Sequence, residues 1–202
     1  MPTSSEEFKK LINDLDQGIE TKFDFPDEVT QDEYAQFLRS LDKNIAIKQL
    51  SSFRVKTLDN PLPLLNALKN KPNIGHAQLP PFALTVLTAG ALARIINTAP
   101  NLTILRLQIT GVETGSCEII HRSLARHQKF DRLFLEAFKD NSPIQAESAD
   151  LISLFQLIRH PGFTMMQIKG FDICDDSAEF FGSIINYPAA SYGVLVSGKP
   201  LK

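Results

Sequence analysis

One arrangement of apolar and polar positions recurs along the chain. In its clearest copy, 102–129, apolar residues first follow the two-residue period of a strand: Leu102, Leu105 and Leu107. A turn through Gly111 is expected next. Apolar residues then follow helical spacing: Ile119, Ile120 and Leu124. The pattern therefore predicts a unit made of a strand, a turn and a helix.

The same order recurs on both sides of this stretch. The other strand triplets are Ile45, Lys48 and Leu50; Ile74, Ala77 and Leu79; Phe130, Leu133 and Leu135; and Phe163, Met166 and Ile168. Their helical stripes are Leu64, Leu65 and Leu68; Leu92, Ile95 and Ile96; Leu154, Phe155 and Ile158; and Phe180, Phe181, Ile184 and Ile185. The register advances by 28 residues from Ala77 to Leu105, by 28 to Leu133, and by 33 to Met166. The longer step predicts an inserted loop at 139–147.

Less regular units are expected at both ends. Phe23 and Phe25 indicate a first strand, and the helix after it carries Tyr34, Phe37, Leu38 and Leu41. Residues 192–197 indicate a last strand with no helix after it. A capping helix over 4–16 is predicted from a capping box, Ser4 with Glu7, and from one apolar stripe: Phe8, Leu11, Ile12 and Leu15. We expect a single domain, 1–202, with a helical cap at 1–18 and units over 19–198.

This pattern resembles the leucine-rich-repeat family in its long strand-plus-helix form, typified by ribonuclease inhibitor, over 19–197. The family consensus is L-x-x-L-x-L-x-x-N/C-x-L, repeated about every 20–29 residues. The resemblance implies an α/β solenoid, a curved horseshoe with a parallel sheet on its concave face and helices on its convex face. The Asn/Cys position falls here on Phe53, Phe82, Thr110, Phe138 and Phe171. These rings predict a stacked aromatic ladder in place of hydrogen-bonding asparagines.

Residues between the apolar strand positions must point away from the core, onto the concave face. The predicted partner-binding residues are His76, Gln78, Ile104, Arg106, Gln108, Arg132, Phe134, Glu136, Met165, Gln167 and Lys169. Lys22, Asp24, Ile47, Gln49 and Leu195 extend the same set. Aromatic residues and Met mixed with Arg are typical of protein interfaces, whereas isolated exposed apolar residues and sheet propensity are the ordinary alternative. Replacing Arg106 and Phe134 together is expected to abolish partner capture and leave thermal stability nearly intact.

Composition limits the classes of partner that can be expected. The 202 residues are 43% hydrophobic and 22% charged with a net charge of −2, so no nucleic-acid partner is expected. No apolar run is long enough to span a membrane, so no membrane partner is expected. The N-terminus lacks the features of a secretory signal, which indicates a cytoplasmic protein or one delivered to host cytosol by a signal-independent route. Cys117 and Cys174, far apart in sequence, indicate buried thiols.

Motifs for catalysis are not found. Gly111 and Gly115 lack the residues of a phosphate-binding loop. His121 and His127 are six apart and so do not share a helix face, which argues against a metal site. Asp172, Asp175 and Asp176 lie between a strand and a helix, where Asp176 or Ser177 is expected to cap the helix rather than bind calcium. Asp131 and Glu136 have no predicted pocket. The sequence predicts no catalytic residue, cofactor or metal.

Two functions fit these observations. The first is a non-enzymatic module that binds a partner protein on its concave sheet face. The family includes inhibitors, adaptor receptors and effectors that intracellular bacteria deliver into host cells, and the irregular consensus resembles the bacterial group. The second is a self-associating scaffold that pairs through its C-terminal strand, because an open strand edge is a template for pairing. The expected state is a monomer or a weak homodimer.

Overall fold

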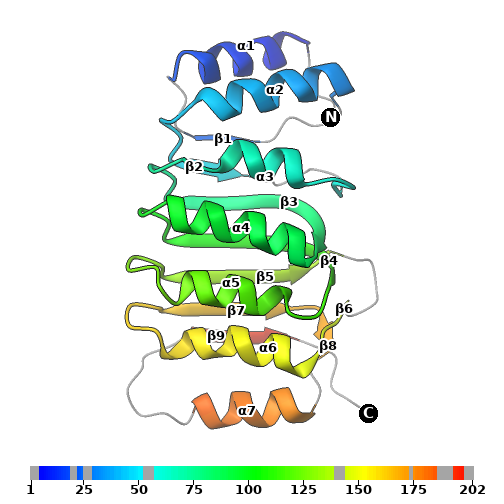
Figure 1. The fold of residues 1–202 in the computed structure, drawn as a ribbon, viewed down its shortest axis with the longest axis vertical. Coiled ribbons are helices and arrows are strands. Elements are labelled where there is room, and N and C mark those ends of the chain that lie inside the picture. Colours follow the sequence, from blue (N-terminus) through cyan, green and yellow to red (C-terminus); the bar gives the residue numbers. More distant parts are fainter. Residues whose placement is uncertain are drawn as a thin grey trace.

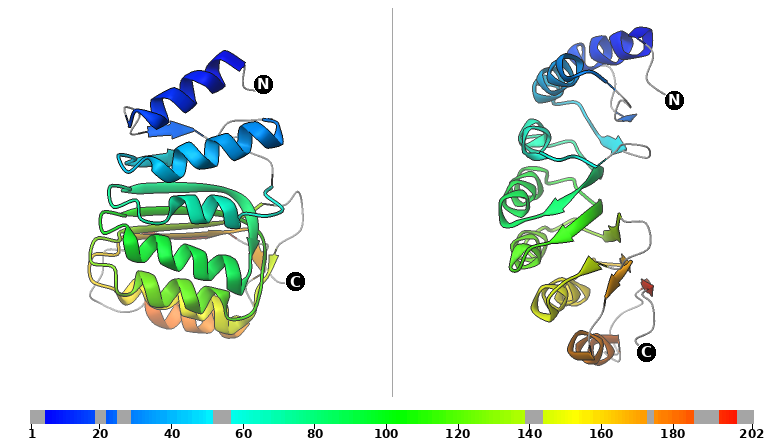
Figure 2. Two further views of the ribbon diagram at one scale, coloured as in Figure 1. Left: turned by 45° about the horizontal axis from the view of Figure 1, so that its top comes forward. Right: turned by 90° about the vertical axis from the view of Figure 1, so that its right-hand side faces the viewer.

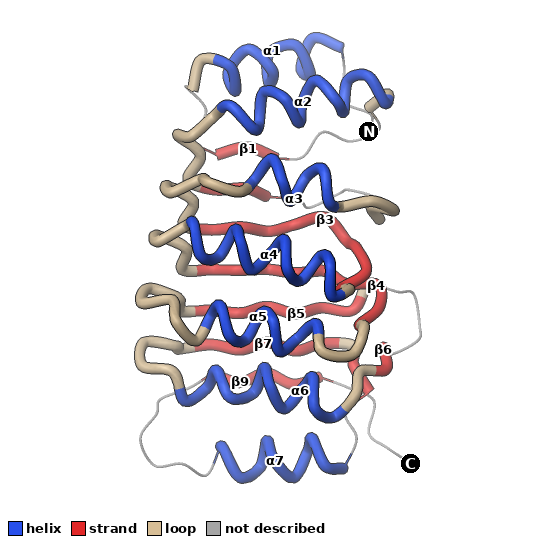
Figure 3. Tube along the Cα trace, viewed as in Figure 1, coloured by secondary structure: helices blue, strands red, loops and turns tan. Residues whose placement is uncertain are grey.

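The computed structural model describes residues 5–18, 22–24, 29–51, 57–138, 144–172, 175–185 and 193–197. Helices and strands alternate along the chain (Figures 1 and 3). The helices are α1 Ser5–Asp16, α2 Gln31–Lys43, α3 Leu62–Leu68, α4 Val86–Thr98, α5 Ser116–Leu124, α6 Ser148–Phe155, the 3₁₀ helix η1 Gln156–Arg159, and α7 Asp175–Ile185. The strands are β1 Lys22–Asp24, β2 Gln49–Ser51, β3 His76–Leu84, β4 Ile104–Val112, β5 Arg132–Ala137, β6 Ile144–Gln145, β7 Met165–Lys169, β8 Phe171–Asp172 and β9 Gly193–Ser197.

In the described part of the chain, seven strands form one parallel sheet in chain order, β1-β2-β3-β4-β5-β7-β9. One register position runs through every pairing: Phe23, Leu50, Ala77, Leu105, Leu133, Met166 and Val194. The steps between these residues are 27, 27, 28, 28, 33 and 28. The predicted steps of 28 and 33 are therefore confirmed. Parallel neighbours need a long crossover, and a helix lies in each crossover that is described.

The fold is α/β, as predicted, with helices on one side of the parallel sheet. Helices α2 to α7 follow an arc whose convex side faces away from the strands (Figure 2). Helix α1 lies against α2 at the N-terminal end of the helical layer. The core between the layers joins strand residues such as Leu105 and Leu107 to helix residues such as Leu92 and Ile120, all 2% exposed or less. No described helix covers the opposite face of the strands (Figure 2).

Residues of neighbouring units help to start the central helices. Thr85 caps α4, and its N–H and side chain bond reciprocally to Thr88. Glu113, which follows the next strand, accepts a hydrogen bond from the Val86 N–H at 2.9 Å. Because the first N–H groups of a helix have no partner within it, these acceptors stabilise the helix start.

The second strand lies in a different register from the predicted one. Leu50 pairs with Ala77, so Ile47 corresponds to Ile74, three residues before the paired position. Ile47 is accordingly fully buried, whereas Ile45 is 63% exposed. The assignment of Ile47 to the concave face is wrong. Both isoleucines suit a strand, and only the pairing with β3 decides which one enters the core.

The predicted aromatic ladder is not formed by the described phenylalanines. Phe82 is buried and pairs with Ile109 rather than Thr110, because the register of β3 shifts after Leu79. Phe138 is 40% exposed. Phe171 is buried but belongs to a different sheet, and Phe53 lies outside the described residues.

Aromatic stacking occurs instead just before the strands. The rings of Phe130 and Phe163, each the first apolar residue of its triplet, stack with centroids 5.9 Å apart.

Two of the strands differ locally from the prediction. The turn expected at Gly111 lies later in the sequence, because β4 continues to Val112. Two prolines, Pro80 and Pro81, stand where β3 changes register. Because proline cannot donate to the strand ladder, it favours such an irregularity.

The insertion contributes a second, two-stranded parallel sheet. Residues 139–143 are outside the described part, but β6 follows them and pairs with β8, which follows β7 almost directly. The Ile144 N–H donates to the Gly170 carbonyl at 2.9 Å.

Helix α7 begins at Asp175, so Asp176 and Ser177 lie inside its first turn and are not the cap that the sequence predicted. Ser4 and Cys174 lie outside the described residues.

Candidate binding surface

The eleven residues predicted to bind a partner lie together on the strand face that carries no helices, which we call the outer sheet face. Cross-strand pairing arranges them in three rows. The rows are His76, Ile104, Arg132 and Met165; Gln78, Arg106, Phe134 and Gln167; and Gln108, Glu136 and Lys169. The residues between them on each strand, such as Leu105 and Leu133, are buried on the helix side.

Arg106 and Phe134 form the centre of the outer sheet face. The guanidinium carbon of Arg106 lies 4.0 Å from the centroid of the Phe134 ring. This contact helps explain why Phe134 is only 7% exposed although no helix covers it. The ring is therefore a platform for Arg106 rather than an exposed contact residue. Truncating it removes buried apolar surface, so the Arg106/Phe134 double replacement is now expected to lower stability as well.

Arg106 has no other polar contact with the residues that the structure describes. Its Nε is buried and has no hydrogen-bond partner among them, and no ion pair joins it to them. The guanidinium is planar and presents its donors in one fixed fork. Stacking on Phe134 holds that fork in place and leaves its N–H groups for an incoming acceptor.

The other nine residues differ in accessibility. Arg132, Met165 and Lys169 are exposed, Gln78 is 6% exposed, and the rest are half-buried: His76, Ile104, Gln108, Glu136 and Gln167. Gln49 stands in register with His76 and extends the first row. Lys22, Asp24 and Leu195 lie on the paired strands β1 and β9, but their side chains are outside the described part.

The eleven residues together carry a positive net charge, whereas the net charge of the whole chain is negative. Three are positive and only Glu136 is negative, a net charge of +2 on a chain of net −2. Arg132 Nε lies 3.0 Å from an oxygen of Asp131, a half-exposed pair of the kind that contributes little to stability. Glu136 lies opposite Lys169 in the next strand. Neither Arg106 nor Lys169 forms an ion pair with a described residue, and Arg106 is in addition held on an aromatic ring.

A polar ladder that the sequence analysis missed runs along the turns before the strands. Asn44, Asn73 and Asn101 donate through Nδ2 to the carbonyls of Leu15, Ile45 and Pro72, respectively, at 2.9–3.0 Å. Each bond joins residues 28 or 29 positions apart, in neighbouring units. The signal is the Pro-Asn pair before the apolar strand residue at 72–74 and again at 100–102. Asparagines thus bridge the units before the strands rather than after them.

Asp150 and Cys117 form a buried polar cluster at the start of α5. Asp150 is 2% exposed and accepts hydrogen bonds from the N–H groups of Gly115 and Cys117, at 3.1 and 3.0 Å. Burial, and then the nearby Asp150 charge, raise the pKa of the Cys117 thiol to about 12. Because only a thiolate is a strong nucleophile, this buried thiol is chemically inert at neutral pH.

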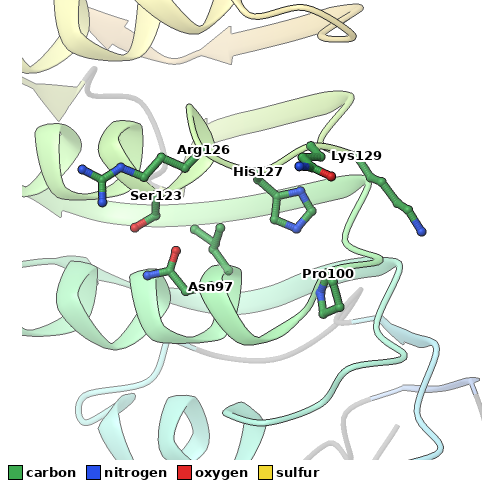
Figure 4. A pocket seen from close by; sticks show the side chains of 8 residues that line it. Asn97, Pro100, Ser123, Arg126, His127 and Lys129 are labelled. Carbon is green, nitrogen blue, oxygen red and sulfur yellow. The ribbon is translucent and has the colours of Figure 1, made fainter.

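A shallow hollow of about 290 Å³ lies on the helical side, between the C-terminal ends of α4 and α5 (Figure 4). Its lining includes Asn97, Ser123, Arg126, His127 and Lys129. His127 Nε2 donates to the Ala99 carbonyl at 2.8 Å, and Arg126 and Lys129 extend in opposite directions (Figure 4). These side chains do not converge on one ligand. Likewise, among the described residues no group of three or more His, Cys, Asp or Glu side chains could hold a metal ion.

Comparison with known proteins does not identify the chain. No model of a protein family matches the sequence, and no curated protein is significantly similar to it. Within the described ranges, no helix has the length and apolar character needed to cross a membrane.

Proposed function

We propose that the chain is a leucine-rich-repeat solenoid of the strand-plus-helix type, and that it binds a partner protein on the outer sheet face. The solenoid is supported by parallel strands in chain order, mostly 27 or 28 residues apart, with helices on one side. In such an array no unit can bury its apolar face alone, so neighbours stack into one continuous core. The stacking leaves an extended sheet face available to a partner.

The observation that carries the binding proposal is the Arg106–Phe134 contact at the centre of that face. Arginine and aromatic residues dominate the binding energy of many protein interfaces. An arginine already held on a ring loses less side-chain entropy when a partner binds. The proposal involves no catalytic residue, cofactor or metal, and it places the array in a cytosol, either its own or that of a host cell as a bacterial effector.

Affinity capture from a eukaryotic cytosolic extract, quantified by mass spectrometry, tests this proposal. The test variant is Arg106→Gln with Lys169→Gln, which removes two charges from the outer sheet face. The matched control is Arg94→Gln with Arg122→Gln, which removes two charges from exposed sites on α4 and α5. We expect a captured protein to be lost from the first variant and retained by the second. Equal capture by both would contradict binding on the outer sheet face.

Self-association is the second candidate function, and it is supported by the position of β9. In the described part of the sheet, β9 stands last and pairs only with β7. A strand edge of this kind offers unpaired N–H and carbonyl groups to another chain. Light scattering over a concentration series tests this alternative. A monomer at the highest concentration would exclude it.

A further inference from the structure

We propose that the outer sheet face recognises an extended protein segment bearing a carboxylate, and that Arg106 is the residue that receives the carboxylate. This inference rests on the proposed function and adds the chemistry of the partner. Its starting point is the arrangement of Arg106, whose guanidinium is stacked on Phe134 at 4.0 Å and whose buried Nε has no hydrogen-bond partner among the described residues.

The geometry of Arg106 matches a carboxylate. The guanidinium fork offers two parallel N–H groups that bind both oxygens of a planar carboxylate, and such charge-assisted bonds are about twice as strong as neutral ones. A buried donor without a partner is costly, so an acceptor that satisfies it is favoured. Stacking on Phe134 orients the fork before any ligand arrives.

The neighbours of Arg106 leave its charge unneutralised. Gln78 on β3 stands opposite it, Gln108 follows it on its own strand, and Gln167 lies beyond Phe134 on β7. All three amides are neutral, and the half-buried Gln108 and Gln167 carry both donors and acceptors, as an extended peptide backbone requires. Glu136, the one carboxylate of the eleven residues, lies opposite Lys169.

The electrostatics favour a protein carboxylate over the phosphates of a nucleic acid. Binding to a nucleic-acid backbone uses several Lys and Arg residues that each contact a phosphate. The outer sheet face has three positive side chains, and Asp131 already pairs with Arg132. The chain as a whole is negative. One stacked arginine among glutamines matches a ligand in which a single carboxylate is surrounded by neutral groups. An acidic side chain on a polypeptide is such a ligand.

NMR titration of the full chain tests the inference. The Arg Nε–Hε signals are followed while hexaglutamate, hexaglutamine or tripolyphosphate is added at constant ionic strength. We expect hexaglutamate to shift the Arg106 signal and to saturate it at millimolar concentrations, and hexaglutamine to leave it unchanged. In Arg106→Lys, followed through backbone amides of β4 and β5, hexaglutamate affinity should fall at least about fivefold, because lysine keeps the charge but lacks the fork. The control Arg94→Lys should change the affinity less than about twofold.

Three results would overturn the inference. Equal shifts with hexaglutamine would show that the carboxylates are not recognised. Tighter binding of tripolyphosphate at the same signal would indicate a phosphate ligand. Unchanged hexaglutamate affinity in Arg106→Lys would show that the fork is not used.

These results are distinguishable from a failure of the proposed function. If Arg106→Gln with Lys169→Gln loses a captured protein while hexaglutamate does not bind, the face binds proteins by other contacts and only the carboxylate inference fails. If capture is unchanged while hexaglutamate shifts Arg106, the carboxylate site exists but the proposed function is wrong.

Discussion

Asp150 is a buried carboxylate that connects two neighbouring units. Its carboxylate is 2% exposed and accepts N–H groups from Gly115 and Cys117, which belong to the preceding unit. Negative charge at a helix N-terminus is also favoured by the helix dipole. One buried side chain therefore joins two units and starts α5.

Replacing Asp150 with alanine should lower the free energy of unfolding by about 2–3 kcal/mol, because the buried Cys117 N–H and the partly buried Gly115 N–H lose their acceptor. Urea unfolding followed by circular dichroism measures the change. The control is Glu118→Ala on α5, where an exposed pair with Arg122 is lost and about 0.5 kcal/mol or less is expected. A similar loss in both variants would contradict the structural role of Asp150.

Cys117 predicts a dependence of stability on alkaline pH. Its pKa is raised from 9.0 to about 12 in the folded chain, chiefly by burial. The unfolded thiol therefore loses its proton in this range while the folded thiol keeps it, so stability falls as pH rises above 9. The difference in unfolding free energy between the parent chain and Cys117→Ala should shrink by about 1.4 kcal/mol for each step of one in pH above this point. A difference that stays constant from about pH 8 to about pH 11 would show that the thiol ionises equally in both states.

At the scale of the element, the junction between β7 and β8 depends on Gly170. Its φ is +77°, and a Cβ built there would lie 2.8 Å from the Cβ of Ala137 in β5. Gly162 has a similar φ of +89° but open space around it. Both positions carry the cost of a left-handed backbone for any other residue, and only Gly170 adds a steric clash.

Gly170→Ala should therefore destabilise the chain more than Gly162→Ala, by at least about 1 kcal/mol. Thermal and urea unfolding of the two variants provide the comparison. Equal losses would mean that Ala137 moves aside, and that the junction does not fix the position of the second sheet.

The elements and the register of β3, β4, β5 and β7 could largely be predicted, but the register of β2 and the irregular pairings could not. The stripe Leu92, Ile95 and Ile96 predicts α4 because one apolar face of a helix is a local property of sequence. The register of β2 depends on contact with β3, and the local pattern of Ile45 and Ile47 does not contain it. The register shift after Leu79 and the pairing of β6 with β8 likewise depend on contacts between distant segments.

For the candidate surface, too, the features set by local sequence could be predicted and those set by contacts between strands could not. Alternation along each strand placed all eleven residues on one face, because side-chain direction follows from strand geometry alone. The exposure of each residue depends on its cross-strand neighbours, so the burial of Phe134 beneath Arg106 could not be predicted. The role of Asp150 also depends on a contact between units.

At the scale of the whole molecule, the described helices and strands mainly contact their neighbours in the layer or the sheet. If the proposed solenoid is correct, stability is lost locally and the ends of the array need caps. At the N-terminal end, the buried Asn44 joins units by donating to the Leu15 carbonyl of α1, at 2.9 Å. Loss of this bond is expected to lower the local stability of α1 and to leave that of the central units unchanged.

Asn44→Ala should speed amide hydrogen exchange in α1 at least about tenfold, which corresponds to about 1.4 kcal/mol of local stability. Exchange in α5 and α6 should stay unchanged. Mass spectrometry of peptides from both regions measures the rates, and Asn101→Ala, which removes an exposed bond of the same kind, is the control. Uniformly faster exchange in all helices would indicate that the chain unfolds as one unit.

Binding of a partner protein to the outer sheet face through Arg106 can be measured directly. Calorimetry gives the dissociation constant between a captured protein and three chains: the parent, Arg106→Gln and Arg94→Gln. We expect binding at least about tenfold weaker for Arg106→Gln, the loss typical of a central interface arginine, and a change below about twofold for Arg94→Gln. Equal affinities for all three chains would contradict binding through Arg106.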